Sequence, residues 1–299
     1  MTVITSYQDA ATQSVDVNGT TFAYRELGPP TGTPIILLNH LAAVLDNWDP
    51  RVVDGIAAKH RVITFDNRGV GASSGKTPNS VEAMARDAVA FIKALGLAQV
   101  DLLGFSMGGF VAQVIAQQEP QLVRKVILAG TGPAGGRGIE NVTALTIVDM
   151  AKGALTLRDA KYYLFFTKTA NGRSQARQFL KRLKERTNDR DKAITLSSFR
   201  AHLEAIHAWG LQEPEDLSRI QQPVFVANGD QDRMVPSSNS GDLARRLPNA
   251  ELAIYPDAGH GGIFQYHQQF VPAALEFLAR EQNGASASSS GRVEAAEAS

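Results

Sequence analysis

Short apolar runs alternate with amphipathic segments along most of the chain. The first apolar runs flank Asn18-Gly19, a dipeptide typical of a tight turn, and predict a hairpin over residues 14–27. Further runs predict strands at 34–39, 61–66, 99–104, 123–129, 223–228 and 251–255. Segments with apolar residues three and four positions apart predict helices at about 47–58, 80–95, 107–118, 239–246 and 264–280. This alternation predicts an α/β fold with a mostly parallel sheet of about eight strands, flanked by helices.

Residues 133–213 interrupt the alternation and read as helices. Their amphipathic stretches carry the aromatic residues Tyr162, Tyr163, Phe165, Phe166, Phe179, Phe199 and Trp209. Aromatic stripes at helical spacing are usually packing residues, so we expect most of these in the interior of the segment. A minority, with Phe166 and Trp209 among them, is expected to face a ligand. The chain thus divides into a core of residues 1–132 and 214–281 and a helical insertion of residues 133–213.

Composition narrows the classes of function. Lys plus Arg equals Asp plus Glu at 30 each, so the formal net charge is zero and nothing suggests nucleic acid or an anionic membrane as a partner. The absence of cysteine excludes disulfides and thiolate chemistry. We expect a cytoplasmic protein, because no apolar run approaches membrane-spanning length and the first residues do not resemble a signal peptide. The low-complexity segment 282–299 is expected to be disordered.

A serine flanked by glycines lies between a predicted strand and a predicted helix. The five residues Gly104-Phe105-Ser106-Met107-Gly108 match Gly-x-Ser-x-Gly. In this context the motif is typical of a nucleophile elbow, a tight turn that exposes a serine hydroxyl above the sheet. The N-terminus of the following helix then points at any oxyanion that develops there. Such a turn requires glycines on both sides of the serine, because neighbouring segments of the chain approach it closely.

An acid and a histidine follow two later strands. The segment 229–236 reads Gly-Asp-Gln-Asp-Arg-Met-Val-Pro and contains Asp230 and Asp232, and His260 follows the strand 251–255. The carboxyl ends of parallel strands meet at one edge of the sheet, where α/β sheets bind ligands, so we expect these side chains near Ser106. A serine hydroxyl needs a base such as histidine to become a nucleophile, and a carboxylate orients that histidine.

These residues resemble the motifs of the α/β-hydrolase superfamily, and more narrowly of its bacterial esterase and cofactor-free haloperoxidase (perhydrolase) branch. The matching segments are Gly-x-Ser-x-Gly at 104–108, Gly-Asp-x-Asp-x-x-Val-Pro at 229–236, Gly-His at 259–260 and Asp-x-Arg-Gly-x-Gly-x-Ser at 66–73. The resemblance covers roughly residues 14–281 and identifies the superfamily better than the substrate. It implies an α/β-hydrolase fold in which the insertion forms a cap, or lid, over the active site.

The resemblance also implies a catalytic triad. Ser106 would be the nucleophile and His260 the general base. Asp232, the second Asp of its motif, would be the orienting acid, and the competing Asp230 reads as a turn residue that bonds the local backbone. Some relatives carry the acid after the preceding strand, but no nearby carboxylate follows residues 123–129, which favours Asp232.

Two backbone N–H groups are expected to form the oxyanion hole, those of Met107 and Leu41. Relatives commonly have His-Gly in the loop 39–43, so His40 fits the pattern and Leu41 departs from it; the Leu side chain is expected to narrow the acyl pocket. His40 is expected to brace this loop and to lie at the substrate. Arg68 is expected to form a structural ion pair rather than a substrate clamp.

The implied function is a serine hydrolase that cleaves small, fairly apolar carboxylic esters or lactones through an acyl-enzyme. No metal and no organic cofactor is implied. Perhydrolase or haloperoxidase-like activity and carbon–carbon bond hydrolysis would use the same triad, and a ligand-binding protein on a hydrolase scaffold is a third alternative. The expected partner is a small-molecule substrate, and the sequence leaves the oligomeric state open.

Overall fold

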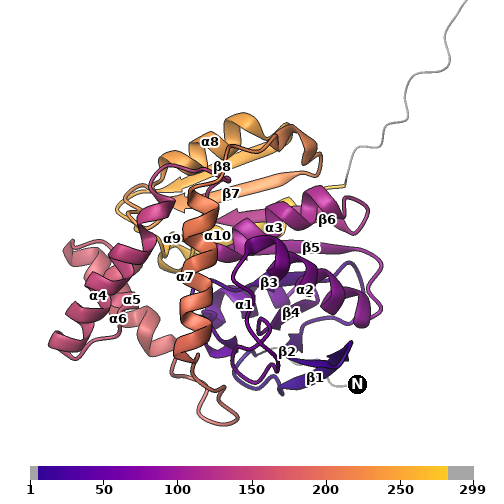
Figure 1. Cartoon of the computed structure of the whole chain (residues 1–299), viewed down its shortest axis with the longest axis horizontal. Helices are drawn as coiled ribbons and strands as arrows, with labels where there is room; N and C mark the ends of the chain where they lie inside the picture. Colours follow the sequence, from indigo (N-terminus) through magenta and orange to yellow (C-terminus); the bar gives the residue numbers. More distant parts are fainter. Residues whose placement is uncertain (1–5, 282–299) are drawn as a thin grey trace, which may run out of the picture.

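An eight-stranded sheet flanked by helices forms the body of the protein (Figure 1). The structure, a computed structural model, describes residues 6–281; the segment 282–299, predicted to be disordered, lies outside the described residues. The strand order is β1-β2-β4-β3-β5-β6-β7-β8. The strands are β1 Gln13–Val17, β2 Thr20–Leu27, β3 Ile35–Leu38, β4 Val62–Phe65, β5 Val100–Phe105, β6 Val123–Ala129, β7 Val224–Gly229 and β8 Ala250–Tyr255.

The sheet is parallel except at one side. β1 and β2 form the predicted hairpin, and both Asn18 and Gly19 have positive φ, as its tight turn requires. β2 is also antiparallel to β4, and the remaining neighbours are parallel. Strands β3, β4, β5 and β7 are buried along their whole length, which explains their continuous apolar runs. The predicted fold class, a mostly parallel α/β sheet of eight strands, is therefore confirmed.

Six helices belong to the core of the fold within residues 6–281. They are α1 Pro50–Ala57, α2 Val81–Ala94, α3 Met107–Gln118, α8 Ser238–Arg246, α9 Gly262–Gln265 and α10 His267–Ala279. The first begins later than predicted, because Asp49 accepts a hydrogen bond from the N–H of Arg51 and Pro50 follows as the first helical residue. The predicted helix 264–280 is divided into α9 and α10 at Tyr266, whose φ of −105° and ψ of 31° are not helical.

The helical insertion lies between β6 and β7 and projects beside the sheet (Figure 1). Its helices are α4 Val142–Thr156, α5 Lys161–Leu164, α6 Ala170–Arg182 and α7 Leu196–Gly210. No helix of residues 6–281 is long and apolar enough to cross a membrane.

Polar contacts join the insertion to the core. Arg182 of α6 forms a buried ion pair with Asp49, the residue that caps α1, with Nη2 and Oδ2 2.6 Å apart. Asp257, in the loop after β8, accepts hydrogen bonds from the hydroxyl groups of Thr167 and Thr169, each at 3.0 Å. Both carboxylates thus bind the insertion, and that of Asp49 also caps α1.

The segment 66–73 follows β4 and binds the loop after β3 and helix α2. Asp66 follows β4, and its Oδ1 accepts a hydrogen bond of 2.9 Å from the N–H of Leu45. The Ser73 hydroxyl donates to the carbonyl oxygen of Asp66 at 2.9 Å. Arg68 pairs with Asp87 of α2 at 2.5 Å, which is the structural ion pair expected from the sequence.

Asp66 also lies against a second carboxyl group, that of Asp191 in the insertion. A methyl group placed on Gly71 would lie 2.2 Å from Oδ2 of Asp66 and 2.6 Å from Oδ2 of Asp191, so both oxygens border the same small space. Gly71 fits there with a φ of +58°. Burial, together with the neighbouring Asp191, raises the pKa of Asp66 well above its usual value.

This carboxyl pair predicts a pH-dependent stability. Because the folded state raises the pKa of Asp66, it binds the proton more tightly than the unfolded chain, so the free energy of unfolding falls as pH rises above about 4 toward the folded pKa. Each unit of pKa difference is worth about 1.4 kcal/mol. Asp66→Asn removes this titration, so its free energy of unfolding should increase relative to that of the wild type as pH is raised from 4.5 to 8.

Urea unfolding of both proteins across this range measures the difference. Asp191→Asn relieves the same pair and should show the same trend. Parallel stability profiles for Asp66→Asn and the wild type would contradict the interpretation.

Candidate active site

Ser106 lies in a sharp turn between β5 and α3. Its φ of 56° and ψ of −120° are unusual for a residue with a side chain. Hydrogen bonds on both sides hold this conformation: its N–H donates to the carbonyl oxygen of Ala129 at 2.9 Å. Its own carbonyl oxygen accepts from the N–H of Gly109 at 2.8 Å and from the hydroxyl of Thr131 at 2.9 Å.

The two glycines of the motif are required by space. A methyl group on Gly104 would lie 2.4 Å from the carbonyl oxygen of Gly108. One on Gly108 would lie only 2.0 Å from the carbonyl oxygen of Leu38 in β3. Backbone lies on the other side of each contact, so neither could be relieved by moving a flexible side chain. The turn can therefore approach the neighbouring strand only with glycine at these positions.

Ser106, His260 and Asp232 form a continuous row of hydrogen bonds. The Ser106 hydroxyl lies 2.9 Å from Nε2 of His260, and Nδ1 of His260 lies 2.8 Å from Oδ2 of Asp232. All three residues are buried, with exposed fractions of 5%, 2% and 6%. The row is therefore shielded from bulk water except on the side of the pocket that Ser106 and His260 line.

The two candidate acids lie in different surroundings. Asp232 is buried, and its second oxygen, Oδ1, accepts hydrogen bonds from the N–H groups of Met234 at 2.9 Å and Val235 at 3.1 Å. These bonds fix the carboxylate that faces His260. Asp230 is exposed and accepts a hydrogen bond from the N–H of Ala258 at 3.2 Å, as a turn residue does.

The insertion supports the histidine loop directly. Phe165, which follows α5, accepts a hydrogen bond of 2.8 Å at its carbonyl oxygen from the N–H of Gly261. Its ring contacts the His260 ring edge-on, with centroids 5.4 Å apart. The ring of Phe105 lies against His260 from β5, at 5.0 Å. The imidazole is thus held between one core aromatic and one from the insertion.

The loop after β3 brings His40 and Leu41 to the same pocket. Nδ1 of His40 lies 2.9 Å from the carbonyl oxygen of Leu41, and the ring contacts those of Phe105 and Phe165. Burial lowers the pKa of His40 to about 3, so the ring is neutral at physiological pH and Nδ1–H donates to that carbonyl. His40 therefore braces the peptide of Leu41 and also lines the pocket.

The N–H of Met107 lies at the start of α3, where the first N–H groups have no partner within the helix. Ala42 continues the opposite loop with a φ of 60°, and its N–H donates to Nδ1 of His202 at 3.3 Å. His202 is buried in α7, and burial lowers its pKa to about 4. A second neutral histidine therefore holds this loop from the insertion.

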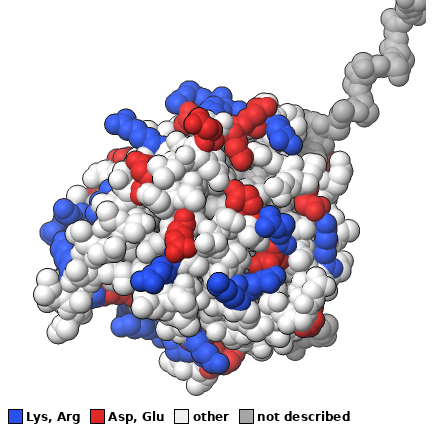
Figure 2. Space-filling view, viewed as in Figure 1, with Lys and Arg blue, Asp and Glu red and all other residues white. Residues whose placement is uncertain are grey.

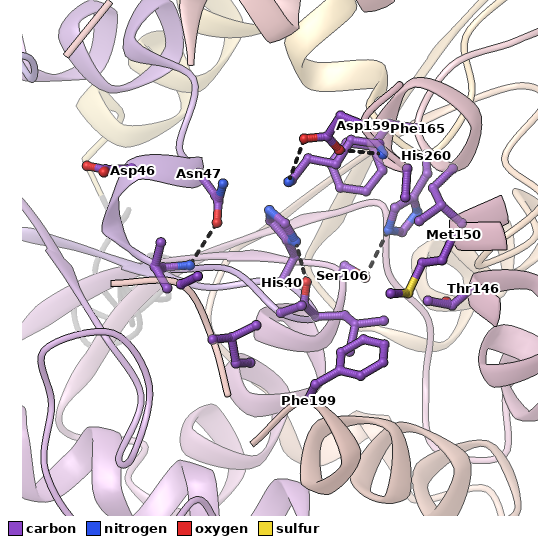
Figure 3. Close-up of a pocket in the computed structure, with 18 of the residues that line it drawn as sticks. His40, Asp46, Asn47, Ser106, Thr146, Met150, Asp159, Phe165, Phe199 and His260 are labelled. Atoms are coloured by element: carbon purple, nitrogen blue, oxygen red, sulfur yellow. Dashed lines mark hydrogen bonds and ion pairs between the residues drawn. The ribbon is translucent and has the colours of Figure 1, made fainter. Parts of the chain in front are cut away.

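A cavity of about 580 Å³ opens above the serine and is shown in Figure 3. Core and insertion both contribute to its wall, with Ser106, His260, His40, Thr146, Met150 and Phe199 around it in the figure. The lining is mainly apolar; its larger apolar side chains are Leu41, Val44, Met150, Leu164, Phe165, Ile194, Leu196, Phe199 and Met234. Such a lining suits an apolar acyl or alcohol group.

Two residues expected at the substrate lie elsewhere. Phe166 is 4% exposed and packs on Phe179, and neither Phe166 nor Trp209 is among the residues that line the cavity. Trp209 stacks on Phe110 of α3 with centroids 5.3 Å apart, between insertion and core. The expectation for both is corrected: their size makes them packing residues. Phe165 and Phe199 line the cavity instead, and no feature of the aromatic pattern along the insertion distinguishes them from its other members.

Comparison with known proteins agrees with this geometry. A family model described as alpha/beta hydrolase fold matches residues 33–265, most of the chain. The chain belongs to the α/β-hydrolase family. An α/β-hydrolase fold protein from Chitinophaga pinensis is 41% identical, with a TM-score of 0.88 over 92% of this chain and 99% of that one.

Curated relatives point to one branch of the α/β-hydrolase family. A non-heme chloroperoxidase from Streptomyces lividans is 27% identical over 87% of this chain and 97% of its own length. A non-heme haloperoxidase from Rhodococcus erythropolis is 28% identical over 82% of this chain and 90% of its own. This α/β hydrolase is therefore similar, over most of its length, to enzymes named as haloperoxidases.

Proposed function

We propose that this enzyme is a serine hydrolase that cleaves small carboxylic esters or lactones through an acyl-enzyme. The observation that carries the proposal is the row of hydrogen bonds from Asp232 through His260 to the hydroxyl of Ser106, at 2.8 and 2.9 Å. Each member then has the partner that its role requires: the nucleophile a base, and the base an orienting carboxylate.

In the first half-reaction, Ser106 Oγ attacks the carbonyl carbon while its proton passes to Nε2 of His260. The tetrahedral intermediate collapses as the bond to the leaving alkoxide breaks, and the proton on His260 is given to that alkoxide. Asp232 keeps Nδ1 protonated, so Nε2 is free to accept. The positive φ of Ser106 directs its hydroxyl out of the sheet toward the cavity.

The oxyanion of the intermediate would accept hydrogen bonds from the N–H groups of Met107 and Leu41. Met107 contributes a helix N-terminus, whose partial positive charge adds to its hydrogen bond. Leu41 lines the cavity on a loop that the neutral His40 and His202 hold in place. In the second half-reaction a water gives a proton to His260 and attacks the acyl carbon. The bond from that carbon to Ser106 Oγ then breaks and His260 returns the proton to Ser106, which releases the acid.

Perhydrolysis is the second candidate, favoured by the relatives named chloroperoxidase and haloperoxidase. Hydrogen peroxide would replace water in the second half-reaction, give a proton to His260 and attack the acyl carbon. The bond from that carbon to Ser106 Oγ would then break, His260 would return the proton to the serine, and the product would be a peroxyacid. The same residues would then serve both reactions, and the ratio of peroxyacid to acid in the presence of hydrogen peroxide distinguishes them.

Substitution of Ser106 tests its role as the nucleophile. Ser106→Ala should fold normally and lose turnover of p-nitrophenyl acetate by about 10³–10⁶-fold in kcat, because the attacking oxygen is gone. A fluorophosphonate should label the wild type at Ser106 and leave the variant unlabelled, as mass spectrometry would detect. Retention of more than a tenth of the turnover would refute the assignment. Wild-type turnover together with labelling of Ser106 would separate an enzyme from a ligand-binding protein.

A matched pair of variants, at Asp232 and Asp230, tests which carboxylate orients His260. Asp232→Asn should lower kcat by about 10⁴-fold, because an amide cannot hold the histidine in the tautomer that accepts the serine proton. Asp230→Asn changes an exposed turn residue two positions away and should leave kcat within a few-fold of the wild type. The reverse ranking in ester hydrolysis would make Asp230 the orienting acid.

We propose that the insertion of residues 133–213 acts as a lid that selects the substrate. It contributes Leu164, Phe165 and Phe199 to the cavity wall, while the row of hydrogen-bonded residues lies on the core. A wall made by the insertion would exclude water and shape the acyl or alcohol pocket.

Trimming this wall should change chain-length selectivity. Phe199→Ala enlarges the cavity, so the preference in kcat/KM should move toward longer acyl chains, with each methylene contact worth roughly 1–3 kcal/mol. Leu155→Ala is the control, because Leu155 lies on the insertion but is 87% exposed and outside the cavity. The measurement is kcat/KM for p-nitrophenyl esters from acetate to decanoate. An unchanged profile in folded Phe199→Ala would assign selectivity to the core loops instead.

A further inference from the structure

Charge is unevenly distributed along the neutral chain. Residues 158–190, which span the middle of the insertion, contain ten Lys and Arg but only three Asp and Glu. Figure 2 shows acidic and basic side chains interspersed over most of the visible face, with basic ones gathered at the left and lower left, where Figure 1 places the insertion. This part of the insertion is therefore the basic region of the protein.

The basic side chains surround a second hollow of about 510 Å³ next to the active-site cavity. Its lining includes five basic side chains: Arg158, Arg177, Lys181, Lys184 and Arg190. We call this hollow the basic groove. It shares Asn47, Asp159 and Arg190 with the wall of the active-site cavity, so the two are adjacent.

The single acidic residue of the groove is already engaged. Oδ1 of Asp159 accepts a hydrogen bond of 2.8 Å from the N–H of Lys161 at the start of α5, and its Oδ2 lies 3.5 Å from the ammonium group of Lys161. Asp159 therefore does little to neutralise the five basic side chains.

Three of the cations lack a partner. Arg177 and Lys181 lie one turn apart on the same face of α6, and Lys184 follows in the turn after it. All three are exposed, and none has an ion pair or a side-chain hydrogen bond within residues 6–281. Like charges at this spacing repel one another and destabilise a helix, so a bound anion would relieve the repulsion.

We infer that the basic groove binds an anionic group of the substrate, a phosphate or a carboxylate that lies beyond the bond to be cleaved. The inference rests on the proposed hydrolase function and adds a substrate class to it: the reacting carbonyl lies in the apolar cavity and the anionic end in the groove. A groove in which five basic side chains face one acidic side chain also concentrates an anionic substrate, an effect that typically speeds association by about tenfold or more.

Binding is tested without turnover. Ser106→Ala protein is titrated with inorganic pyrophosphate by calorimetry at low ionic strength. Saturable binding is expected, and the triple variant Arg177→Gln/Lys181→Gln/Lys184→Gln should weaken it at least tenfold. The matched control is Arg219→Gln/Lys59→Gln/Lys76→Gln, which removes one Arg and two Lys from exposed positions outside the groove and should bind as before.

Turnover is compared in matched substrate pairs. Butyryl-coenzyme A and the butyryl thioester of N-acetylcysteamine differ in the phosphates of the leaving group. Monomethyl glutarate and methyl pentanoate differ in a carboxylate on the acyl chain. The groove triple variant should lower the anionic-to-neutral ratio of kcat/KM at least tenfold for one pair, with the neutral substrate changed less than twofold. The pair that responds tells phosphate from carboxylate.

Three results would overturn the inference: unchanged ratios in both pairs, an equal fall for charged and neutral substrates, or the same effect in the control triple variant. Sedimentation with anionic phospholipid vesicles that depends on the three groove residues, without saturable pyrophosphate binding, would also overturn it in favour of a membrane surface. Groove-dependent pyrophosphate binding in a protein that hydrolyses none of the four substrates would leave the groove standing and refute the proposed function.

Discussion

The contact between Gly108 and the carbonyl oxygen of Leu38 is the constraint on which the site depends. Because Gly108 has no Cβ, α3 can begin directly beside β3. The chain must turn sharply at Ser106 to reach that position. The turn leaves Ser106 with a positive φ, a conformation that costs on the order of 1–3 kcal/mol and persists only where the surroundings impose it. The hydrogen bonds from Ser106 to β6 and from Thr131 to Ser106 impose it here.

The rest of the site is positioned relative to this turn. β7 and β8 are parallel neighbours on the same side of β5, so the loops that carry Asp232 and His260 emerge at the same edge of the sheet. The insertion completes the arrangement through contacts that are themselves buried. The ion pair between Arg182 and Asp49 has exposed side-chain fractions of only 9% and 0%, so loss of either partner would leave a charge in the protein interior.

Local sequence was sufficient for the core of the fold and for the residues brought together at the sheet edge. The signals that identify them are local: the spacing of hydrophobic residues, the turn at Asn18 and the glycines around Ser106. The order of the motifs along the chain then restricted the acid and the base to two loops. Helix boundaries were less exact where the determinant was a single contact, as at Asp49. The approach of Asp66 to Asp191 joins positions 125 residues apart, and no local pattern reports it.

Aromatic residues in the insertion show the same limit. An amphipathic pattern identifies a buried face but not what lies opposite that face. Trp209 faces α3 and Phe199 faces the cavity, although both lie on α7 and both read as apolar positions of one helix. Only the packing of the insertion against the core distinguishes them.

The hydrogen bond from Gly261 to the carbonyl oxygen of Phe165 has a consequence for motion. It couples the position of the stretch after α5 to that of the loop that carries His260. A hinged opening of the whole insertion would therefore have to break this hydrogen bond or move the loop of His260 with it. We expect ligands to enter and leave the cavity through a local rearrangement of residues 190–196, where Leu196 is 75% exposed at the rim. His260 would then keep its position beside Ser106 during turnover.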